Sequence, residues 1–289
     1  MIKTSNFSDR DLAQFRDCQR RSFAILESVA SSLQGGETEK QVARRLVALY
    51  REAGVKTFFH LPVVLFGDRA GLPGSWRIAN FFPRERELRE GDSVILDAAP
   101  LFGGYLVDTS FSFCLGENSR HREMMQHLSQ YRESVPAAVN RGESFRSIAH
   151  AVHQTMKAEG FEPVHTKHPG NVLGHRAIKT WSLPYKPRLQ GFDALSLGWF
   201  RLQDGLVQKG VGKKSPLWNE SPASDHTAHD GLWLVEPHAS RDGVGAKWEE
   251  MLLIKDGVAS WLDDDTPHCR QWQNIGSGAS YAPAMNAAH

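Results

Sequence analysis

Four carboxylates occupy positions at which they could hold metal ions. Asp97 ends one predicted strand and Asp108 lies on the next, so the two can be near neighbours across a hairpin. Buried like charges a few ångströms apart persist only where cations or protons neutralise them, which favours a site for dications. Because aspartate is mostly exposed, two separate strand-end side chains are an equally good interpretation of this pair alone.

The other two carboxylates, Glu236 and Glu249, each lie inside an apolar, strand-like segment. Glutamates are almost never fully buried without a partner, so both are expected to have a positive neighbour. That neighbour can be a metal ion, but an arginine or a lysine could also pair with them. Alternation along the strand does not say whether Glu249 or Glu250 points inward.

Three histidines, His165, His168 and His175, cluster where a predicted strand ends. Neutral imidazole is the commonest nitrogen ligand for Mn, Fe, Co or Zn. Taken singly, each is more often a surface or hydrogen-bonded histidine than a ligand, and the cluster raises the expectation of a ligand. A carboxylate-rich site with one imidazole favours Mn, Fe or Co over Zn.

The elements that would position these residues alternate helices with antiparallel-looking strands, which is typical of an α+β fold. Ser8 is expected to cap the first helix, and Thr38 with Gln41 forms the capping box of the second. Helices are predicted from Ser8 to Gly35, from Thr38 to Gly54, and at 119–140 and 145–159. Strands are predicted at 58–66, 93–98, 105–115, 163–168, 232–236, 246–254 and 259–262.

Residues 179–230 form a different stretch, which is rich in Pro, Gly, Trp and Lys, lacks sustained periodicity, and is predicted to be an insertion. Its tryptophans, Trp181, Trp199 and Trp218, would pack the insertion onto the domain or onto a second subunit of a homodimer. Residues 275–289 are rich in Gly, Ser and Ala and are predicted to form a flexible C-terminal tail.

Composition argues against several classes of protein. The net charge of +1, from 34 basic and 33 acidic residues, gives no sign of a nucleic-acid partner or an anionic membrane. The three cysteines are far apart, which argues against a disulfide framework and against a thiolate zinc site. The N-terminus has no apolar signal region, and the longest nearly apolar run, 58–66, is shorter than the roughly 20 residues of a membrane helix. A cytoplasmic protein is therefore expected.

In these carboxylates the chain resembles the pita-bread metallopeptidases, which are methionine aminopeptidase, aminopeptidase P, prolidase and creatinase. The segment Gly91-Asp-Ser-Val-Ile-Leu-Asp97, followed by Asp108-Thr-Ser-Phe, is similar to the strand pair that carries two ligand aspartates in that family. Val235-Glu-Pro237 resembles the Glu-Pro ligand strand, and Trp248-Glu-Glu250 resembles the final ligand strand. The four carboxylates agree with the family in order and spacing over about residues 80–257.

The resemblance implies a curved antiparallel sheet with helices on its outer face, in a single catalytic domain over 1–274 without the N-terminal domain of creatinase. It implies two divalent metal ions, of which Asp97 chelates one, while Asp108 and Glu249 bridge both. Glu236 and a histidine would complete the other. His168 is the preferred ligand because His175, seven residues later, would then be the family's substrate-facing histidine. The rival alignment makes His175, which follows a glycine, the ligand.

The chain departs from the family pattern in two places. Asn80 stands where the family has a histidine that handles the scissile amide, and the insertion replaces a Gly-rich stretch. Asn80 and His175 are therefore the expected substrate-binding residues, and Glu236 is expected to shuttle the proton.

Three functions compete. The first is an aminopeptidase-like hydrolase in which a metal-bridging hydroxide attacks the amide of a peptide or small substrate. The second is a non-peptide metalloenzyme, creatinase-like or biosynthetic. The third is a metal-free binding module, which the survival of all four carboxylates disfavours.

Overall fold

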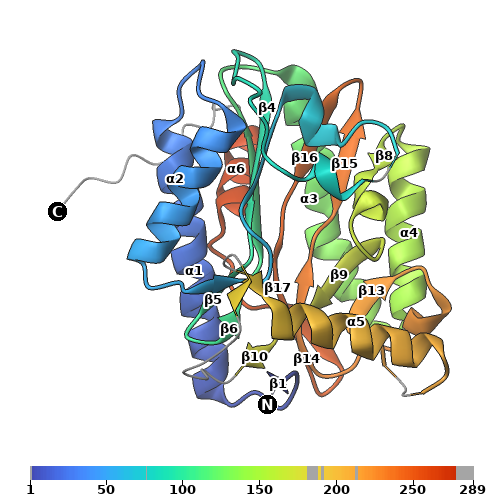
Figure 1. Cartoon of the computed structure of the whole chain (residues 1–289). Coiled ribbons are helices and arrows are strands. Elements are labelled where there is room, and N and C mark those ends of the chain that lie inside the picture. Colours follow the sequence, from blue (N-terminus) through green and yellow to red (C-terminus); the bar gives the residue numbers. More distant parts are fainter. Residues whose placement is uncertain (1, 76, 181–187, 190–191, 212–213, 278–289) are drawn as a thin grey trace.

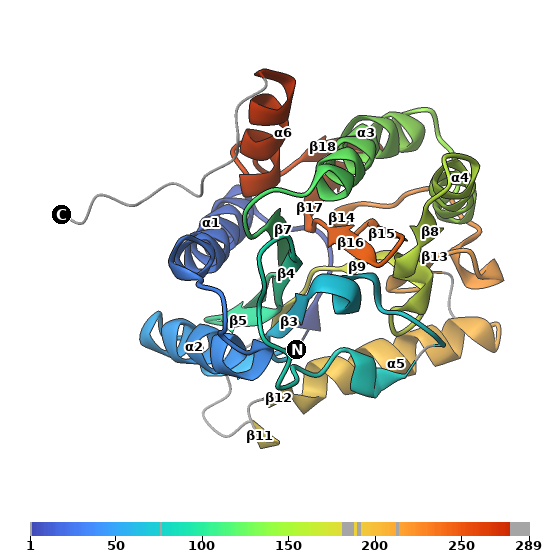
Figure 2. The ribbon, with the colours of Figure 1, turned by 90° about the horizontal axis from the view of Figure 1, so that it is seen from above.

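Strands fill the centre of the structure and the helices pack around them, as the α+β prediction requires (Figure 1, Figure 2). The computed structural model describes residues 2–75, 77–180, 188–189, 192–211 and 214–277. The helices are α1 (Asp9–Ser32), α2 (Glu39–Glu52), α3 (Ser119–Asn140), α4 (Phe145–Ala158), α5 (Ala194–Gln208) and α6 (Pro267–Ser277).

The strands of the described residues form four sheets, and two of them carry most of the candidate site. A three-stranded sheet has the order β3 (Val63–Phe66), β4 (Ser93–Ala98), β7 (Thr109–Cys114). A five-stranded sheet has the order β13 (Leu217–Asn219), β9 (Val172–Arg176), β14 (Gly231–Val235), β17 (Glu250–Lys255), β18 (Val258–Trp261).

The remaining two sheets flank this pair. One has the order β16 (Val244–Lys247), β15 (His238–Arg241), β8 (Glu162–Pro163). The other runs β1 (Ile2–Lys3), β10 (Lys179–Thr180), β6 (Tyr105–Leu106), β5 (Pro100–Phe102), β2 (Thr57–Phe58), β12 (Phe192–Asp193), β11 (Arg188–Leu189). Paired strands are antiparallel throughout, except that β12 runs parallel to β2.

The predicted helix starts are confirmed by their caps. The Ser8 side chain accepts a hydrogen bond from the Asp11 backbone, and Thr38 and Gln41 form the predicted capping box of α2. Ser144 caps α4 in the same way. Helix α3 continues through Pro136, although a proline inside a helix usually bends or ends it.

Four predicted strands are wrong in their extent, and three of the differences shape the site. The segment 105–115 is divided into β6 and β7, which belong to different sheets, and Asp108 lies between them instead of on a strand. The segment 58–66 is divided into β2 and β3, and the irregular residues between them include His60. The segment 163–168 is mostly a 3₁₀ turn, Val164–Lys167. The segment 246–254 is divided between β16 and β17, because the backbone of Glu249 pairs with Ser110 of the neighbouring sheet instead of with β14. A continuous apolar run does not reveal that a chain crosses from one sheet to another.

Two hydrophobic clusters hold the helices against the sheets. Helices α1 and α2 pack on the β3-β4-β7 sheet through fully buried residues that include Phe15, Leu46, Tyr50 and Phe111. Helices α3 and α4 pack on the five-stranded sheet through a second cluster that includes Phe145, Trp218, Trp233 and Trp248. The candidate site lies where the two sheets meet.

The segment 179–230, which is predicted to be an insertion, contributes to this core. Trp218 is fully buried, and its ring stacks on Phe145 at a centroid distance of 3.9 Å. This tryptophan therefore packs onto the domain, which is one of the two arrangements predicted for the tryptophans of this segment. Trp199 lies on α5 against Phe200, and Trp181 lies outside the described residues. Residues 275–277 of the predicted tail belong to α6, and the rest of that tail lies outside the described residues.

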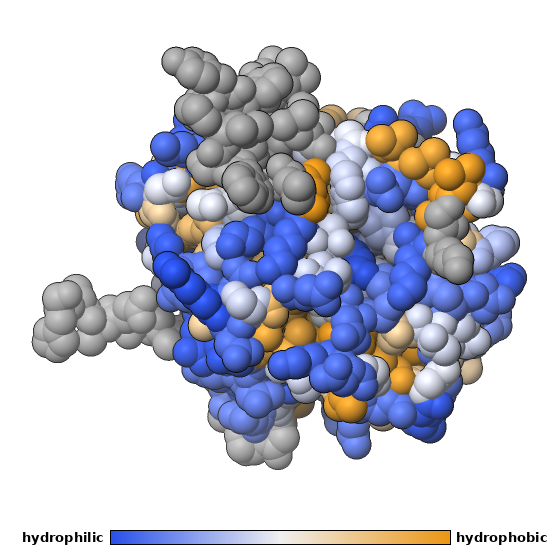
Figure 3. Space-filling view, turned by 90° about the horizontal axis from the view of Figure 1, so that it is seen from below, coloured by the Kyte–Doolittle hydropathy of each residue, from blue (hydrophilic) through white to orange (hydrophobic). Residues whose placement is uncertain are grey.

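Exposed hydrophobic residues are spread over the surface. Seen from below, the molecule is mostly hydrophilic with separate hydrophobic areas (Figure 3). Among the residues that the structure describes, the large exposed hydrophobic ones are Phe82, Leu202, Val211 and Val258. Single residues of this kind need no partner, so the homodimer stays a prediction. Among the described helices, none combines the length and the hydropathy that a membrane span requires.

Candidate metal centre

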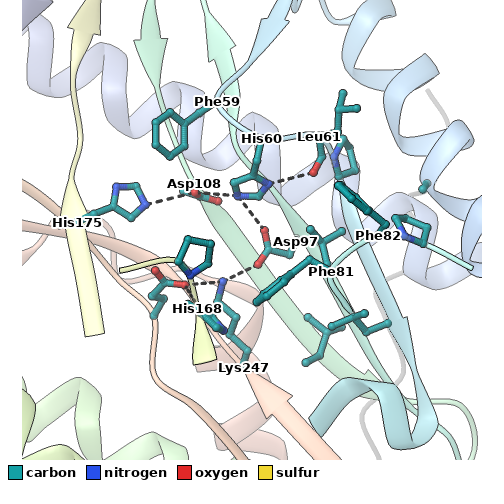
Figure 4. Close-up of a pocket in the computed structure, with 18 of the residues that line it drawn as sticks. Phe59, His60, Leu61, Phe81, Phe82, Asp97, Asp108, His168, His175 and Lys247 are labelled. Atoms are coloured by element: carbon teal, nitrogen blue, oxygen red, sulfur yellow. Dashed lines mark hydrogen bonds and ion pairs between the residues drawn. The ribbon is translucent and has the colours of Figure 1, made fainter. Parts of the chain in front are cut away.

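A cavity of about 1120 Å³ leads to the junction of the two central sheets. Its walls come from α2, from residues 59–65 and 81–83, and from α5. Its floor holds the ionisable residues Asp97, Asp108, His168, His175, Glu236 and Lys247 (Figure 4). Charged groups at the floor of a deep apolar cavity are typical of an active site.

The four predicted carboxylates converge there. Asp97 lies on β4, and Asp108 directly precedes β7, the strand that pairs with β4. Glu236 directly follows β14, and Glu249 directly precedes β17. Each is at most 6% exposed. The structure therefore brings together residues from four separate strand ends, as the sequence predicts.

The neighbouring glutamate has a different role. Glu250 is fully buried and accepts hydrogen bonds from Arg132 Nε at 2.8 Å and from His268 Nε2 at 2.9 Å. Glu250 is thus paired with basic side chains of the protein, which is the alternative that the sequence analysis also considered for Glu249. The alternative between the two glutamates is resolved, because Glu249 is the one that faces the other carboxylates.

A lysine that the sequence analysis did not single out lies inside the carboxylate cluster. The Nζ atom of Lys247 lies 2.5 Å from Asp97 Oδ2, 2.8 Å from Glu236 Oε2 and 2.8 Å from Glu249 Oε2. Burial alone would lower the pKa of Lys247, but the three carboxylates raise it well above its usual value. Burial alone would likewise raise the pKa of Glu236, but Lys247 and His168 hold it well below its usual range. A residue two positions before Glu249 shares its face of an extended chain, and that spacing is the signal that could have identified Lys247.

The two candidate ligand histidines have different surroundings. His175 on β9 points its Nε2 atom toward Asp108 Oδ2 at 3.4 Å and toward Glu249 Oε1 at 3.7 Å. Its other nitrogen, Nδ1, lies 3.2 Å from the carbonyl oxygen of Arg176. A proton on Nδ1, donated to that carbonyl, leaves the lone pair of Nε2 facing the carboxylates. This geometry suits a metal ligand.

His168 instead uses both of its ring nitrogens in a chain of hydrogen bonds. His238 Nε2 donates to the carbonyl oxygen of Ala70 at 2.6 Å, which leaves His238 Nδ1 as an acceptor for His168 Nε2 at 3.0 Å. His168 Nδ1 then donates to Glu236 Oε2 at 2.7 Å. Because both nitrogens donate, neither has a lone pair for a metal ion. The structure thus favours His175 as the ligand, although the sequence analysis preferred His168.

His60 is a second residue that the sequence analysis missed, because the segment around it reads as one strand. Its Nε2 atom lies 3.1 Å from Asp108 Oδ2 and 3.5 Å from Asp97 Oδ1 (Figure 4). Burial alone would lower the pKa of His60, but the charges of Asp108 and Asp97 raise it to about 9. His60 and His175 in turn hold the pKa of Asp108 below its usual range, against the effect of burial.

Asn80 does not line the cavity. Its amide nitrogen lies 3.3 Å from the carbonyl oxygen of Ser75, and its side-chain oxygen lies 3.4 Å from Arg84. The next residues, Phe81 and Phe82, line the cavity instead. Substrate contact by Asn80 therefore stays a prediction that this geometry does not favour.

Several buried carboxylate oxygens lack a hydrogen-bond partner among the described residues. They are Asp97 Oδ1, Asp108 Oδ1 and both side-chain oxygens of Glu249; Lys247 lies at ion-pair distance from one of the latter without forming a hydrogen bond. Burial and the nearby charge of Asp108 raise the pKa of Glu249 well above its usual value. Buried charged oxygens without partners are costly, and a divalent cation would satisfy them. Asp108, His175 and Glu249 offer ligand atoms within 4.8 Å of one another, so this donor set fits a metal ion.

An α+β fold in which buried carboxylates and an imidazole meet at one cavity is typical of proteins with a metal-binding site. Comparison of sequences identifies the family within this class. The model of metallopeptidase family M24 matches residues 13–256, and the chain therefore belongs to this family.

Individual proteins that are similar in sequence include peptidases. The chain is 26% identical over 155 residues to a methionine aminopeptidase of Thermococcus kodakarensis, covering 50% of each protein. It is 23% identical over 168 residues to an uncharacterized peptidase of Staphylococcus aureus, covering 58% of this chain and 46% of the relative. The chain thus spans about half the length of the curated relatives it matches.

Solved structures confirm the pita-bread fold. A prolidase from Thermococcus sibiricus matches with a TM-score of 0.62 and 17% identity, over 91% of this chain and 62% of that one. Escherichia coli aminopeptidase P in complex with substrate matches with a TM-score of 0.59 and 13% identity, over 94% of this chain and 59% of that one. At these identities the likeness concerns the fold.

Proposed function

We propose that this protein is a metal-dependent hydrolase that cleaves an amide or peptide C–N bond in the manner of an aminopeptidase. The observation that carries the proposal is the set of unpartnered carboxylate oxygens beside His175 Nε2. The family supports it, as do the aminopeptidases and the prolidase among the similar proteins. A cytoplasmic location and a peptide or small amide substrate belong to the same proposal.

Asp108, His175 and Glu249 would hold a divalent ion, for which Mn, Fe or Co suits the mainly oxygen donor set. Bound there, the ion would polarise a carbonyl and acidify a water. The two-ion arrangement implied by the family resemblance would also use Asp97 and Glu236. Both of these carboxylates contact Lys247.

Glu236 is proposed to move the proton, as the sequence analysis expected. Its Oε2 atom accepts a hydrogen bond from His168, which is held in place by His238. These hydrogen bonds keep a proton donor, His168 Nδ1, beside the Glu236 carboxylate at the cavity floor. With His175 assigned to the metal, His168 takes over from it as the histidine that faces the substrate.

Metal content tests the proposal. Wild-type protein purified with Mn supplied is expected to retain metal, and Asp108→Ala is expected to lose it because a buried ligand oxygen is removed. Elemental analysis gives the metal content, and Asp17→Ala, an exposed aspartate on α1, is the matched control. Metal-free wild-type protein would instead leave the binding module as the function.

A second candidate, a non-peptide metalloenzyme, is favoured by the walls of the cavity. Ala43 and Val47 of α2, Phe59, Phe81 and Phe200 make these walls largely apolar. The volume of about 1120 Å³ exceeds the ~300–1000 Å³ usual for small-molecule sites. A short dipeptide would leave most of this space empty, whereas an amide with a large apolar group would fill it.

Substitution in the wall separates the two candidates. Val47→Asp is expected to lower kcat/KM for an amide with a long apolar group about tenfold or more, since a charge enters the apolar wall. Turnover of a short peptide should change little, and Leu202→Asp, at a position 59% exposed and outside the cavity lining, should affect neither. If wild-type protein cleaves only the short peptides, the second candidate is excluded.

A further inference from the structure

The ammonium group of Lys247 lies where the carboxylate cluster would otherwise need a cation. Its three nearest oxygens belong to Asp97, Glu236 and Glu249, at 2.5, 2.8 and 2.8 Å. These carboxylates come from three separate strand ends, and Lys247 as a whole is only 4% exposed. Figure 4 shows the ammonium pointing into the cluster from the side opposite His60. A lysine ammonium has three donors, so each one has an acidic neighbour.

This arrangement divides the site into two halves. On one side, Asp97 Oδ2 and Glu236 Oε2 face the ammonium, and Glu236 also accepts a hydrogen bond from His168. On the other side, Asp108 Oδ1 and Glu249 Oε1 have no hydrogen-bond partner among the described residues, and His175 Nε2 faces both side chains. In the first half, Asp97 Oδ1 also lacks a hydrogen-bond partner in the described part of the chain, but His60 Nε2 lies 3.5 Å from it. The need for a further cation is therefore greatest in the second half.

The balance between the carboxylate charges and the possible cations supports the same division of the site. Lys247 and a single dication together bring three positive charges to the four buried carboxylates, and His60 lies beside Asp108 and Asp97. Two dications would already offset all four, and the ammonium would then add a further positive charge in direct contact with their ligands. To make room, Lys247 would have to give up three short ion pairs and stay buried without a partner, which is strongly unfavourable.

We propose that Lys247 takes the place of a second metal ion, so that the centre binds one divalent ion, at Asp108, His175 and Glu249. The inference rests on the proposed function, because it presumes that these residues bind metal. Asp97 and Glu236 hold the ammonium and do not chelate an ion of their own. Lys247 is thus a fixed part of the centre and determines its stoichiometry.

Counting ions in the intact chain tests this. Wild-type protein saturated with Mn²⁺ and freed of excess metal is expected to hold one ion per chain by elemental analysis. Its electron paramagnetic resonance spectrum should have the six-line pattern of an isolated Mn²⁺. Lys247→Met, which keeps the length of the side chain and removes the charge, is expected to hold two ions and to show the spectrum of a coupled pair. Lys247→Arg keeps the charge and should still bind one ion, as should Lys255→Met at an exposed lysine of β17.

Two ions in wild-type protein would overturn the inference, and so would one ion in a folded Lys247→Met variant. The wild-type count decides the matter even if that variant does not fold. Absence of metal from wild-type protein and all variants would instead refute the proposed function itself, so the two failures are distinguishable.

Discussion

Replacing Glu39 with alanine is expected to lower the free energy of unfolding by about 3–5 kcal/mol, because it leaves a buried guanidinium without its counter-ion. Glu39 is the first residue of α2 and is fully buried. Its carboxylate accepts hydrogen bonds from Arg69 Nε at 2.9 and 3.0 Å, and from the backbone nitrogens of Phe66 and Arg84. Urea unfolding with an unchanged m value measures the loss.

The same residues shape the cavity, which gives this prediction a functional side. Arg69 also donates to the carbonyl oxygen of Phe82 at 2.9 Å, so Glu39 indirectly holds the segment 81–83 that lines the cavity. Glu85→Ala is the matched control, since Glu85 is exposed and its salt bridge to Lys40 lies at the surface. Its unfolding midpoint should not move. A Glu39→Ala variant as stable as this control would show that the buried network contributes nothing.

The sequence identifies Glu236 and Glu249 as candidate site residues because each stands in a local context that is unusual for an acid. Glu236 and Glu249 lie in apolar strand contexts, and burial without a partner is so costly that such positions indicate a cation. The caps of α1 and α2 are predictable for a similar reason, since each depends on two residues three positions apart.

What the sequence does not predict depends on contacts between distant segments. Lys247 reaches Asp97 across 150 positions, and His60 reaches Asp108 across 48. His60 has no local signal that separates it from an ordinary loop histidine, and Lys247 has only its two-residue spacing from Glu249. The division of 246–254 into two strands has the same origin, because Glu249 pairs with Ser110 far away in the sequence.

The choice between His168 and His175 is the remaining difference between sequence and structure, and it leads to a sharp prediction. His175→Ala is expected to weaken Mn²⁺ binding about a hundredfold or more, the share of one ligand in a typical site. His168→Ala should leave the affinity within about tenfold, because His168 contacts Glu236 rather than the ion. Titration calorimetry measures both affinities, and His150→Ala, at an exposed histidine paired with Glu220, is the control.

The effect on kcat should be the reverse of the effect on metal affinity, with the larger loss in His168→Ala. With saturating metal, His168→Ala is expected to lower kcat by about 10²–10⁴, the usual contribution of a general acid or base, because the proton beside Glu236 is lost. The His175→Ala variant should recover part of its activity as the metal concentration rises, since its defect is in binding the ion. If His168→Ala loses the metal while His175→Ala retains it, the ligand preferred from sequence is correct. His175 would then be the histidine that faces the substrate, and the hydrogen bonds of His168 to Glu236 and His238 would have to open to admit the ion.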